Sequence, residues 1–361
     1  MAEPEPGPLV VIRDRTPAPS EQTERFWSQA IERFEAAAAG RLIERDLIVG
    51  EVPVRLGFAG LAMYDAVFPA FEHLVSQTRM EPARRVLIWD TASTGVEPPE
   101  PIWNETDVGP HGEVLSLGEG SIHAAADGWG RLLVYDARSG TLVFHAPDVA
   151  LFPWHEYAAP MRSGLHWLLT GTKRHLIHGA AVGEGGRGLL VTAPSGSGKS
   201  TLAVACFCAG LDVAGDDFVV VTLDGVPRAH SLYATAKLDR RSIELLGPDP
   251  SLITNPGFTD DEKAVLDLRR GPIVTKLPID GIVVPRLTGV STLALRRIGA
   301  AEALRQIGPS SLVVMPRPRG PALATAAELA RNLPAWHLEL GEDVLAAVGC
   351  IRDLLAAEVA V

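Results

Sequence analysis

One short stretch constrains this chain more than any other: Ala193-Pro-Ser-Gly-Ser-Gly-Lys-Ser-Thr201. It has the Walker A form G-x-x-x-x-G-K-[ST], with Ala193 in the place of the first glycine. An apolar, strand-like run (188–194) leads into the motif, and an apolar, helix-like run (199–209) continues from it. A glycine-rich loop between a strand and a helix predicts a phosphate-binding P-loop at the edge of an α/β sheet.

The residue types in this loop suit a nucleotide polyphosphate. Gly196 and Gly198 let the backbone turn so that consecutive N–H groups face one anion. The Lys199 ammonium supplies charge for the β- and γ-phosphates, and the Ser200 hydroxyl can coordinate Mg²⁺. We therefore expect ATP and Mg²⁺ as cofactors. The predicted nucleotide-binding residues are Ser195, Gly196, Ser197, Gly198, Lys199, Ser200 and Thr201.

Two adjacent carboxylates, Asp216 and Asp217, lie in the apolar run 211–223, which we predict to be one strand. Neighbouring side chains on a strand face opposite sides, so the two acids would do different work. One could hold Mg²⁺ while the other approaches an acceptor hydroxyl; the alternative is a solvated pair at a strand kink. Beside a P-loop, acids in so apolar a run need a cationic partner, which favours a site. Asp224 is a weaker candidate for the metal, because Gly225 follows it in a hairpin signal.

Composition excludes several classes of protein. The chain has 361 residues, 47 % of them hydrophobic, which is enough for two folded domains. Its 33 Lys and Arg against 44 Asp and Glu give a formal charge of −11, the wrong sign for a general nucleic-acid binder. Its three cysteines are too few for a disulfide framework and lack zinc spacing. No apolar run is long enough to span a bilayer, and the acidic, proline-rich start does not resemble a signal peptide, so we expect a cytoplasmic protein.

The pattern along the chain predicts a mobile tail (1–20), an α/β module of unknown role (21–157) and a P-loop domain (158–361). Strands and helices alternate in the second half, but hairpins intrude, which predicts a mixed sheet and not a purely parallel one. Other predicted elements are strands at 9–12, 46–58, 85–90 and 176–182, a hairpin at 131–146, and helices at 21–39, 61–77 (broken or kinked at Pro69), 160–174 and 237–246.

Three motifs follow one another along the chain: His178-Gly179 on a predicted strand, the loop 195–200, and Asp216-Asp217 on the next predicted strand. In these motifs and their order the chain resembles HPr kinase/phosphorylase and its kinase-domain relatives, whose P-loop core is similar to that of phosphoenolpyruvate carboxykinases. The resemblance covers about 176–221 well, extends weakly to the C-terminus and does not cover 1–150. It implies that Asp216 is the general base facing the acceptor, that Asp217 is the metal-side acid, and that His178 lies near the phosphates; the alternative for His178 is an ordinary strand residue. The predicted catalytic residues are therefore Asp216, His178 and Lys199, and the predicted metal ligands are Ser200 and Asp217.

These observations predict an ATP-dependent kinase that transfers the γ-phosphoryl group to an alcohol. The acceptor is left open as a protein or peptide serine or a small-molecule hydroxyl, because the family's glycine-rich C-terminal stretch linked to dephosphorylation is not found here. The alternative is a nucleotide-binding regulatory protein that switches a partner without phosphoryl transfer. A basic group, Lys237, Arg240 and Arg241, is either an exposed helix face or a source of charge for the transferred phosphoryl. A homo-oligomer is compatible with the sequence.

Overall fold

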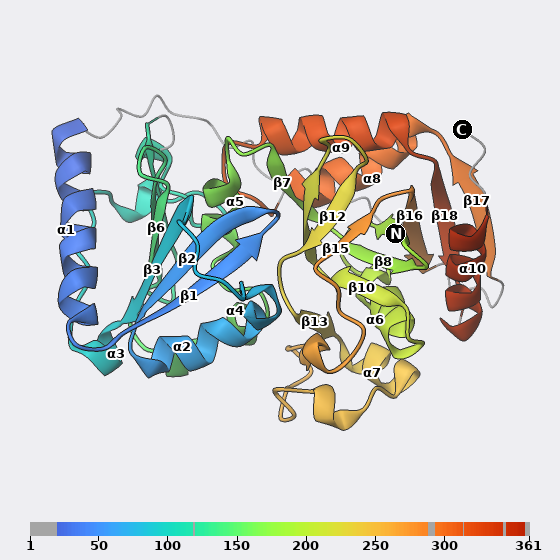
Figure 1. Cartoon of the computed structure of the whole chain (residues 1–361), viewed down its shortest axis with the longest axis horizontal. Coiled ribbons are helices and arrows are strands. Elements are labelled where there is room, and N and C mark those ends of the chain that lie inside the picture. The colour runs from blue at the N-terminus through green and yellow to red at the C-terminus, as the bar shows by residue number, and fades with distance from the viewer. Residues whose placement is uncertain (1–19, 118–119, 288–292, 313, 342–343, 358–361) are drawn as a thin grey trace, which may run out of the picture.

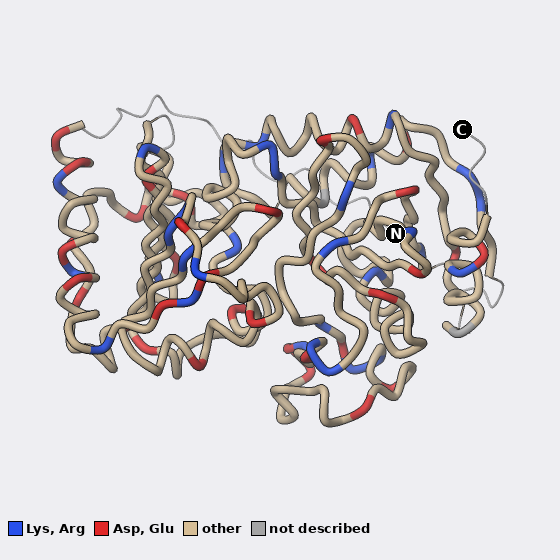
Figure 2. The backbone as a smooth tube through the Cα atoms, in the orientation of Figure 1, with Lys and Arg blue, Asp and Glu red and all other residues tan. Residues whose placement is uncertain are grey.

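The computed structural model describes residues 20–117, 120–287, 293–312, 314–341 and 344–357. The strand expected at 9–12 and nearly all of the tail expected at 1–20 lie outside these residues. The described chain is mixed α/β with mixed sheets, as predicted, and its two halves lie side by side (Figure 1). Acidic and basic residues are interspersed over both halves (Figure 2).

The first half is built on a six-stranded mixed sheet, in the order β1-β2-β3-β6-β5-β4. Its strands are β1 (Leu42–Val49), β2 (Val52–Ala59), β3 (Arg84–Asp90), β4 (Ile122–Ala126), β5 (Leu132–Asp136) and β6 (Thr141–Ala146). The prediction of a single strand over 46–58 is wrong, because β1 and β2 form an antiparallel hairpin. The chain reverses at Gly50 and Glu51, both of which have positive φ. The hairpin predicted at 131–146 is confirmed as β5 and β6.

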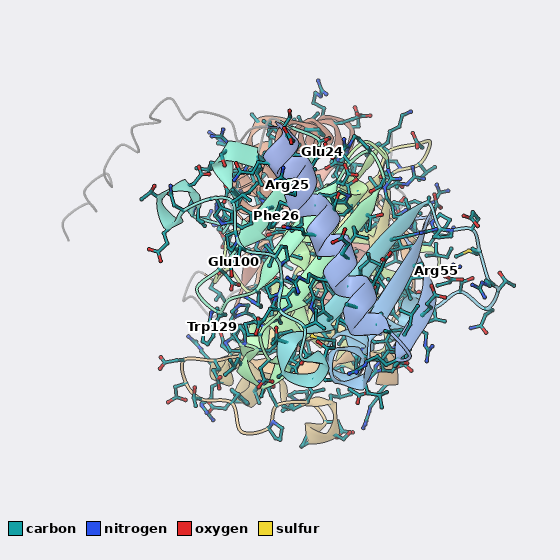
Figure 3. The ribbon with its side chains drawn as sticks, turned by 90° about the vertical axis from the view of Figure 1, so that its left-hand side faces the viewer. Glu24, Arg25, Phe26, Arg55, Glu100 and Trp129 are labelled. Atoms are coloured by element: carbon teal, nitrogen blue, oxygen red, sulfur yellow. The ribbon has the colours of Figure 1, made fainter. Side chains whose placement is uncertain are left out.

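Helices cover both faces of this sheet. Helix α1 (Ser20–Ala38) runs across one face and buries Phe26, Ala30 and Phe34, which recur at helical spacing (Figure 3). The opposite face is covered by α2 (Leu61–Val67) and α5 (Arg162–Leu169). As Pro69 predicts, α2 gives way to two short 3₁₀ turns, Phe68–Ala70 and Glu72–Leu74. The helix predicted at 160–174 is shorter: α5 begins after Met161, whose φ is positive, and ends at Leu169, before β7 begins at Arg174. The remaining short helices are α3 (Thr91–Thr94), α4 (Trp154–Ala158) and 3₁₀ turns at Glu105–Asp107, Leu115–Leu117 and Val149–Leu151.

The second half contains a second six-stranded sheet, in the order β10-β8-β9-β16-β18-β17. Its strands are β8 (Ala180–Glu184), β9 (Arg187–Val191), β10 (Asp212–Gly215), β16 (Gly281–Leu287), β17 (Ala294–Ile298) and β18 (Ala335–Leu340). The three central strands, β9, β16 and β18, are parallel to one another. Each outer strand is antiparallel to the strand it pairs with: β8 to β9, β10 to β8, and β17 to β18. The core on one face includes α6 (Lys199–Cys208) and α10 (Val344–Ala356), and that on the other includes α8 (Ala300–Leu312) and α9 (Gly320–Asn332).

A four-stranded sheet, β15-β12-β11-β7, and a hairpin, β13-β14, complete the second half. The elements are β7 (Arg174–His178), β11 (Phe218–Thr222), β12 (Arg228–Ser231), β13 (Thr235–Leu238), α7 (Arg240–Leu246), β14 (Ala264–Asp267) and β15 (Lys276–Pro278), with 3₁₀ turns at Pro250–Leu252 and Leu268–Arg270. The helix predicted at 237–246 is therefore partly wrong: Lys237 lies on β13, and α7 starts only after its N-cap Asp239.

Two predicted strands, 176–182 and 211–223, are each two strands in different sheets. The first breaks at Gly179, where an added Cβ would lie 2.7 Å from the Val191 carbonyl oxygen. The second breaks at Asp216 and Asp217, and Asp217 has a φ of 65°. Because the chain crosses from one sheet to the other at both points, neither run can stay continuous. The two breaks lie together, since the Gly179 N–H donates to the Asp217 carbonyl at 3.0 Å.

The largest apolar core joins the two halves. It contains Leu56 and Phe144 from the first sheet and Val220 and Tyr233 from the second half. The predicted division at 157/158 stays a proposal. Within the ranges listed above, no helix combines the length and the apolar character needed to cross a membrane.

Candidate functional site

The glycine-rich loop (193–198) connects β9 to α6, as the motif predicts. Gly198 precedes α6 with a φ of 94°, and no side chain caps this end of the helix. The Lys199 side chain is buried, and its Nζ donates to the carbonyl oxygens of Ala193 (2.8 Å) and Pro194 (3.3 Å). Burial lowers the pKa of Lys199, while the carboxylates of Asp216 and Asp217 raise it. The lysine and both acids therefore belong to one electrostatic site.

The hydroxyls of the loop differ in their partners. Ser197 Oγ is buried and has no hydrogen-bond partner among the described residues. Thr201 Oγ1, in contrast, lies 2.8 Å from Ser242 Oγ on α7, so this hydroxyl joins two helices. The Ser200 hydroxyl is close enough to Asp216 to lower the pKa of that carboxyl group. The hydroxyls of Ser197 and of the exposed Ser195 are thus available to a ligand, and Ser200, although it donates to Asp216, keeps its oxygen lone pairs for one.

Asp216 and Asp217 occupy the break between β10 and β11. Their different orientations come from this turn and not from strand alternation, which was the predicted reason. The left-handed φ at Asp217 is an uncommon backbone conformation for a residue other than glycine, and such strain concentrates at functional sites. The peptide N–H of Phe218 donates to the Asp216 carbonyl at 2.7 Å, which closes the turn.

Asp217 is held by two partners. One oxygen lies 3.2 Å from His178 Nε2, and the other pairs with Lys237 Nζ. Burial alone would raise the pKa of Asp217, but the Lys237 ammonium and then His178 hold it well below its usual range. Asp217 is therefore a permanently ionised group at neutral pH.

Asp216 is the more buried acid, with 1 % of its surface exposed. Its Oδ2 accepts a hydrogen bond from the Lys237 peptide N–H at 3.2 Å, whereas its Oδ1 has no partner among the described residues. Burial and then the Asp217 charge raise the pKa of Asp216. The environment thus pushes the pKa values of two adjacent carboxyl groups in opposite directions, a pattern that characterises acid–base pairs.

His178 stands at the end of β7, paired with Phe218 of β11. Its ring stacks on the Phe218 ring at 5.1 Å between centroids. Its peptide N–H donates to Ser311 Oγ (3.1 Å), and its carbonyl accepts from Thr192 Oγ1 (3.0 Å). These contacts fix the imidazole beside Asp217.

Sequence reasoning foresaw some of this cluster and missed the rest. Of the basic group, only Lys237 reaches the acids; Arg240 pairs with Asp260 at 2.5 Å, and Arg241 is exposed. The roles of Thr192 and Ser311 around His178 were missed, because their positions in the chain carry no motif. The contact between Arg162 and Phe218, with the guanidinium 5.3 Å from the ring centroid, was missed for the same reason.

A cavity of about 480 Å³ opens on the outer side of the glycine-rich loop. Ser195, Gly196 and Ser197 form one wall. The other walls come from the end of β16, from α8 and from β18, and include Arg286, Arg305 and His337. His337 Nε2 lies 2.7 Å from Glu302 on α8, which fixes that wall. The volume falls within the range of small-molecule sites.

The residues present fit a magnesium nucleotide. Loop N–H groups and the uncapped start of α6 suit phosphate oxygens. Lys199 supplies a buried cation, and the unpartnered oxygens of Ser197 and Asp216 are polar atoms that a ligand would satisfy. Among the described residues no three His, Cys, Asp or Glu side chains form a metal cage. Mg²⁺ does not require one, since it is commonly bound through one or two protein groups and phosphate oxygens.

Comparisons with known proteins add little to this geometry. Neither a protein-family model nor a curated protein sequence matches the chain. Among solved structures, the chain is similar to the HPr(Ser) kinase/phosphatase from Coxiella burnetii, with 13 % identity and a TM-score of 0.30. The match covers 50 % of this chain and 95 % of that one. The functional proposal therefore rests on the residues of the site.

Proposed function

We propose that this chain is an ATP-dependent phosphotransferase that transfers the γ-phosphoryl group to an alcohol. The observation that carries the proposal is the grouping of a buried loop lysine, Lys199, with two adjacent acids of opposite pKa shifts. The nucleotide would lie in the 480 Å³ cavity, with its phosphates on the loop. The family resemblance and the phosphoenolpyruvate-carboxykinase-like arrangement belong to the same proposal.

In this proposal Asp216 is the general base. Its Oδ1 is unpartnered, and its raised pKa makes it a stronger base than an ordinary carboxylate. Asp216 accepts the hydroxyl proton while the acceptor oxygen forms its bond to the γ-phosphorus and the bond to the departing ADP oxygen breaks. Lys199 stabilises the charge on the phosphates throughout.

In this proposal the ionised Asp217 carboxylate binds Mg²⁺ together with the Ser200 hydroxyl. Bound Mg²⁺ would neutralise charge on the β- and γ-phosphates. Both oxygens of Asp217 already have partners, in His178 and Lys237. A metal held by Asp217 must therefore compete with one of these contacts. His178 orients Asp217 and lies next to the phosphates in this arrangement.

The alternative, a nucleotide-dependent switch, needs Lys199 and Ser200 but has no use for a base. The unpartnered oxygen of Asp216 in a buried position favours chemistry over binding alone, because leaving such a group unsatisfied is costly. Proteins keep such groups where they serve a function.

The test is nucleotide binding followed by turnover. MgATP at 100 times its dissociation constant should add about 2.7 kcal/mol to the free energy of unfolding. Lys199→Ala should lose this stabilisation, because the backbone cannot replace the ammonium charge. Lys276→Ala is the matched control, since the Lys276 side chain is more than half exposed and its ammonium lies 3.7 Å from Glu51, away from the loop. Equal stabilisation of wild type and Lys199→Ala in a thermal melt would contradict the proposal.

A further inference from the structure

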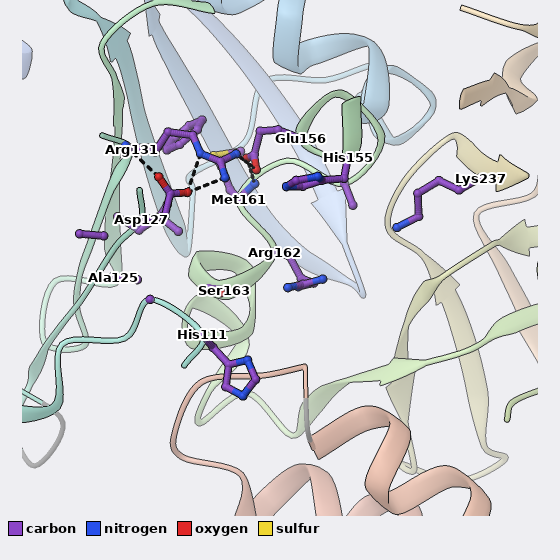
Figure 4. A pocket seen from close by; sticks show the side chains of 15 residues that line it. His111, Ala125, Asp127, Arg131, His155, Glu156, Met161, Arg162, Ser163 and Lys237 are labelled. Carbon is purple, nitrogen blue, oxygen red and sulfur yellow. Dashed lines mark hydrogen bonds and ion pairs between the residues drawn. The ribbon is translucent and has the colours of Figure 1, made fainter. Parts of the chain in front are cut away.

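A second cavity, of about 180 Å³, lies where the two halves of the chain meet (Figure 4). Its walls combine Asp127, Arg131 and Glu156 with Arg162 at the start of α5 and Lys237 on β13. Arg162, Lys237 and His155 direct their side chains into the same space. The cavity holds on the order of six water volumes, which suits a small molecule.

The acids of this cavity are already paired. Arg131 contacts Asp127 at 2.5 Å and also pairs with Glu156. The other oxygen of Glu156 accepts from the Met161 peptide N–H at 2.8 Å. The two carboxylates are thereby engaged, and they leave Arg162 without a counter-charge in direct contact.

Arg162 is a half-buried cation with no hydrogen bond or ion pair to any of the described residues, and its Nε is fully buried. Its contact is with the face of Phe218. Arg162 is also the first residue of α5, whose N-terminus has no side-chain cap. The first peptide N–H groups of a helix lack partners within it, so a free guanidinium and free N–H groups meet at one point. Together they form a site for an anion.

The cavity is next to the proposed transfer site. Phe218, under the Arg162 guanidinium, directly follows Asp217 and stacks on His178. Lys237 lines the cavity while its peptide N–H contacts Asp216 and its ammonium contacts Asp217. The residues of the two sites are therefore in direct contact.

We propose that the 180 Å³ cavity is the acceptor site and that Arg162 and the α5 N-terminus bind an anionic group, a phosphate or a carboxylate, carried by a small alcohol. This inference rests on the proposed function and deepens it by naming the class of acceptor. The anionic group would anchor the molecule at Arg162, with its hydroxyl on the side of Asp216. Lys237 and His155 complete the wall between these points.

The experiment uses the full chain saturated with Mg²⁺ and the non-hydrolysable ATP analogue AMPPNP, so that the glycine-rich loop is already occupied. Three probes are titrated by calorimetry: glycerol 3-phosphate, glycerate and glycerol. We expect at least one of the two anionic alcohols to bind at least tenfold more tightly than glycerol, and the stronger of them distinguishes phosphate from carboxylate. Arg162→Gln should weaken that binding at least about tenfold, the effect of losing a charged hydrogen bond.

Two further variants separate charge from folding. Arg162→Lys keeps the positive charge but loses the planar guanidinium, which can donate two hydrogen bonds to one anionic group. The affinity of this variant for the anionic probe should therefore lie between those of the wild type and Arg162→Gln. Arg241→Gln removes an exposed arginine outside the cavity and should bind the probes as the wild type does. The inference is overturned if neither anionic probe binds the wild type better than glycerol, or if Arg162→Gln binds them as the wild type does. Failure of AMPPNP itself to bind is a different result, which overturns the proposed function and this inference with it.

Discussion

At the scale of single residues, the two adjacent acids of the site have opposite effects on how the stability of the fold changes with pH. Between the ordinary carboxyl pKa and the raised pKa of Asp216, the folded state binds more protons than the unfolded state, so this group lowers stability as pH rises. The depressed pKa of Asp217 does the reverse: it stabilises the fold above the ordinary carboxyl pKa, and this contribution is lost as pH falls. At neutral pH, Asp216 therefore costs stability, whereas Asp217, paired with Lys237 and His178, contributes to it.

We predict that Asp216→Asn lowers phosphoryl transfer by about 10² to 10⁴-fold, the usual effect of losing a general base. Its free energy of unfolding at neutral pH should stay the same or rise, because a buried charge is removed. Slow ATP hydrolysis can report turnover until the acceptor is identified, since water can replace the alcohol. A variant that hydrolyses MgATP at the wild-type rate would show that Asp216 is not the base.

Asp217→Asn should behave differently. It leaves the Lys237 ammonium without its carboxylate, and breaking a buried ion pair from one side costs about 3 kcal/mol or more. We expect a lower denaturation midpoint and weaker Mg²⁺-dependent binding of ATP, measured with and without the metal. If this variant loses turnover with no change in stability or ATP affinity, the roles of the two acids must be exchanged.

At the scale of elements, the site depends on where chain segments end. The loop reverses into α6 through Gly198, whose φ of 94° lies in the region that glycine adopts easily. A Cβ at this position would lie 2.6 Å from Leu340 Cδ1 on β18. The start of α6 is therefore fixed by backbone conformation and by contact with the sheet.

We predict that Gly198→Ala displaces this start and weakens MgATP binding at least tenfold. The positive φ alone should cost about 1 to 2 kcal/mol of stability. Gly210→Ala is the matched control, since Gly210 has a φ of 84° and a Cβ added there would meet no atom within 4 Å. The control should show a similar loss of stability in denaturant titration with unchanged MgATP affinity. Equal effects of the two changes on affinity would contradict this account of the loop.

At the scale of the whole molecule, the two halves share one apolar core and several polar contacts. His73 Nε2 lies 2.6 Å from Ser231 Oγ, and the Ala234 peptide N–H donates to the Ala70 carbonyl at 2.8 Å. A boundary at 157/158 crosses the same core, so cutting the chain there would expose apolar side chains of both parts. The proposed nucleotide-binding residues all lie after the boundary, but the core of their part of the chain includes side chains from before it.

We predict that thermal unfolding is a single cooperative transition by calorimetry, and that MgATP shifts all of it. The reason is that side chains such as Val220 and Tyr233 pack in the same core as Phe144. Hydrogen exchange should show that MgATP also slows the globally exchanging amides of the first sheet. Two separate transitions, with only the later half of the chain responding to the nucleotide, would show that the halves fold independently.

The sequence by itself determined the mixed α/β class, the hairpin at 131–146, the break at Pro69 and the position of the glycine-rich loop between β9 and α6. These features are local, because they follow from apolar periodicity, turn residues and short-range sterics. Only the tertiary structure decided that the runs 176–182 and 211–223 are each divided into two strands of different sheets. A long apolar run in the sequence does not indicate the residue at which the chain passes from one sheet to another. It also decided the partners of Asp216, Asp217 and Arg162, which come from segments distant in the chain. Those partners depend on how β7, β13 and α5 pack around the turn between β10 and β11, a long-range property that no motif in the sequence encodes.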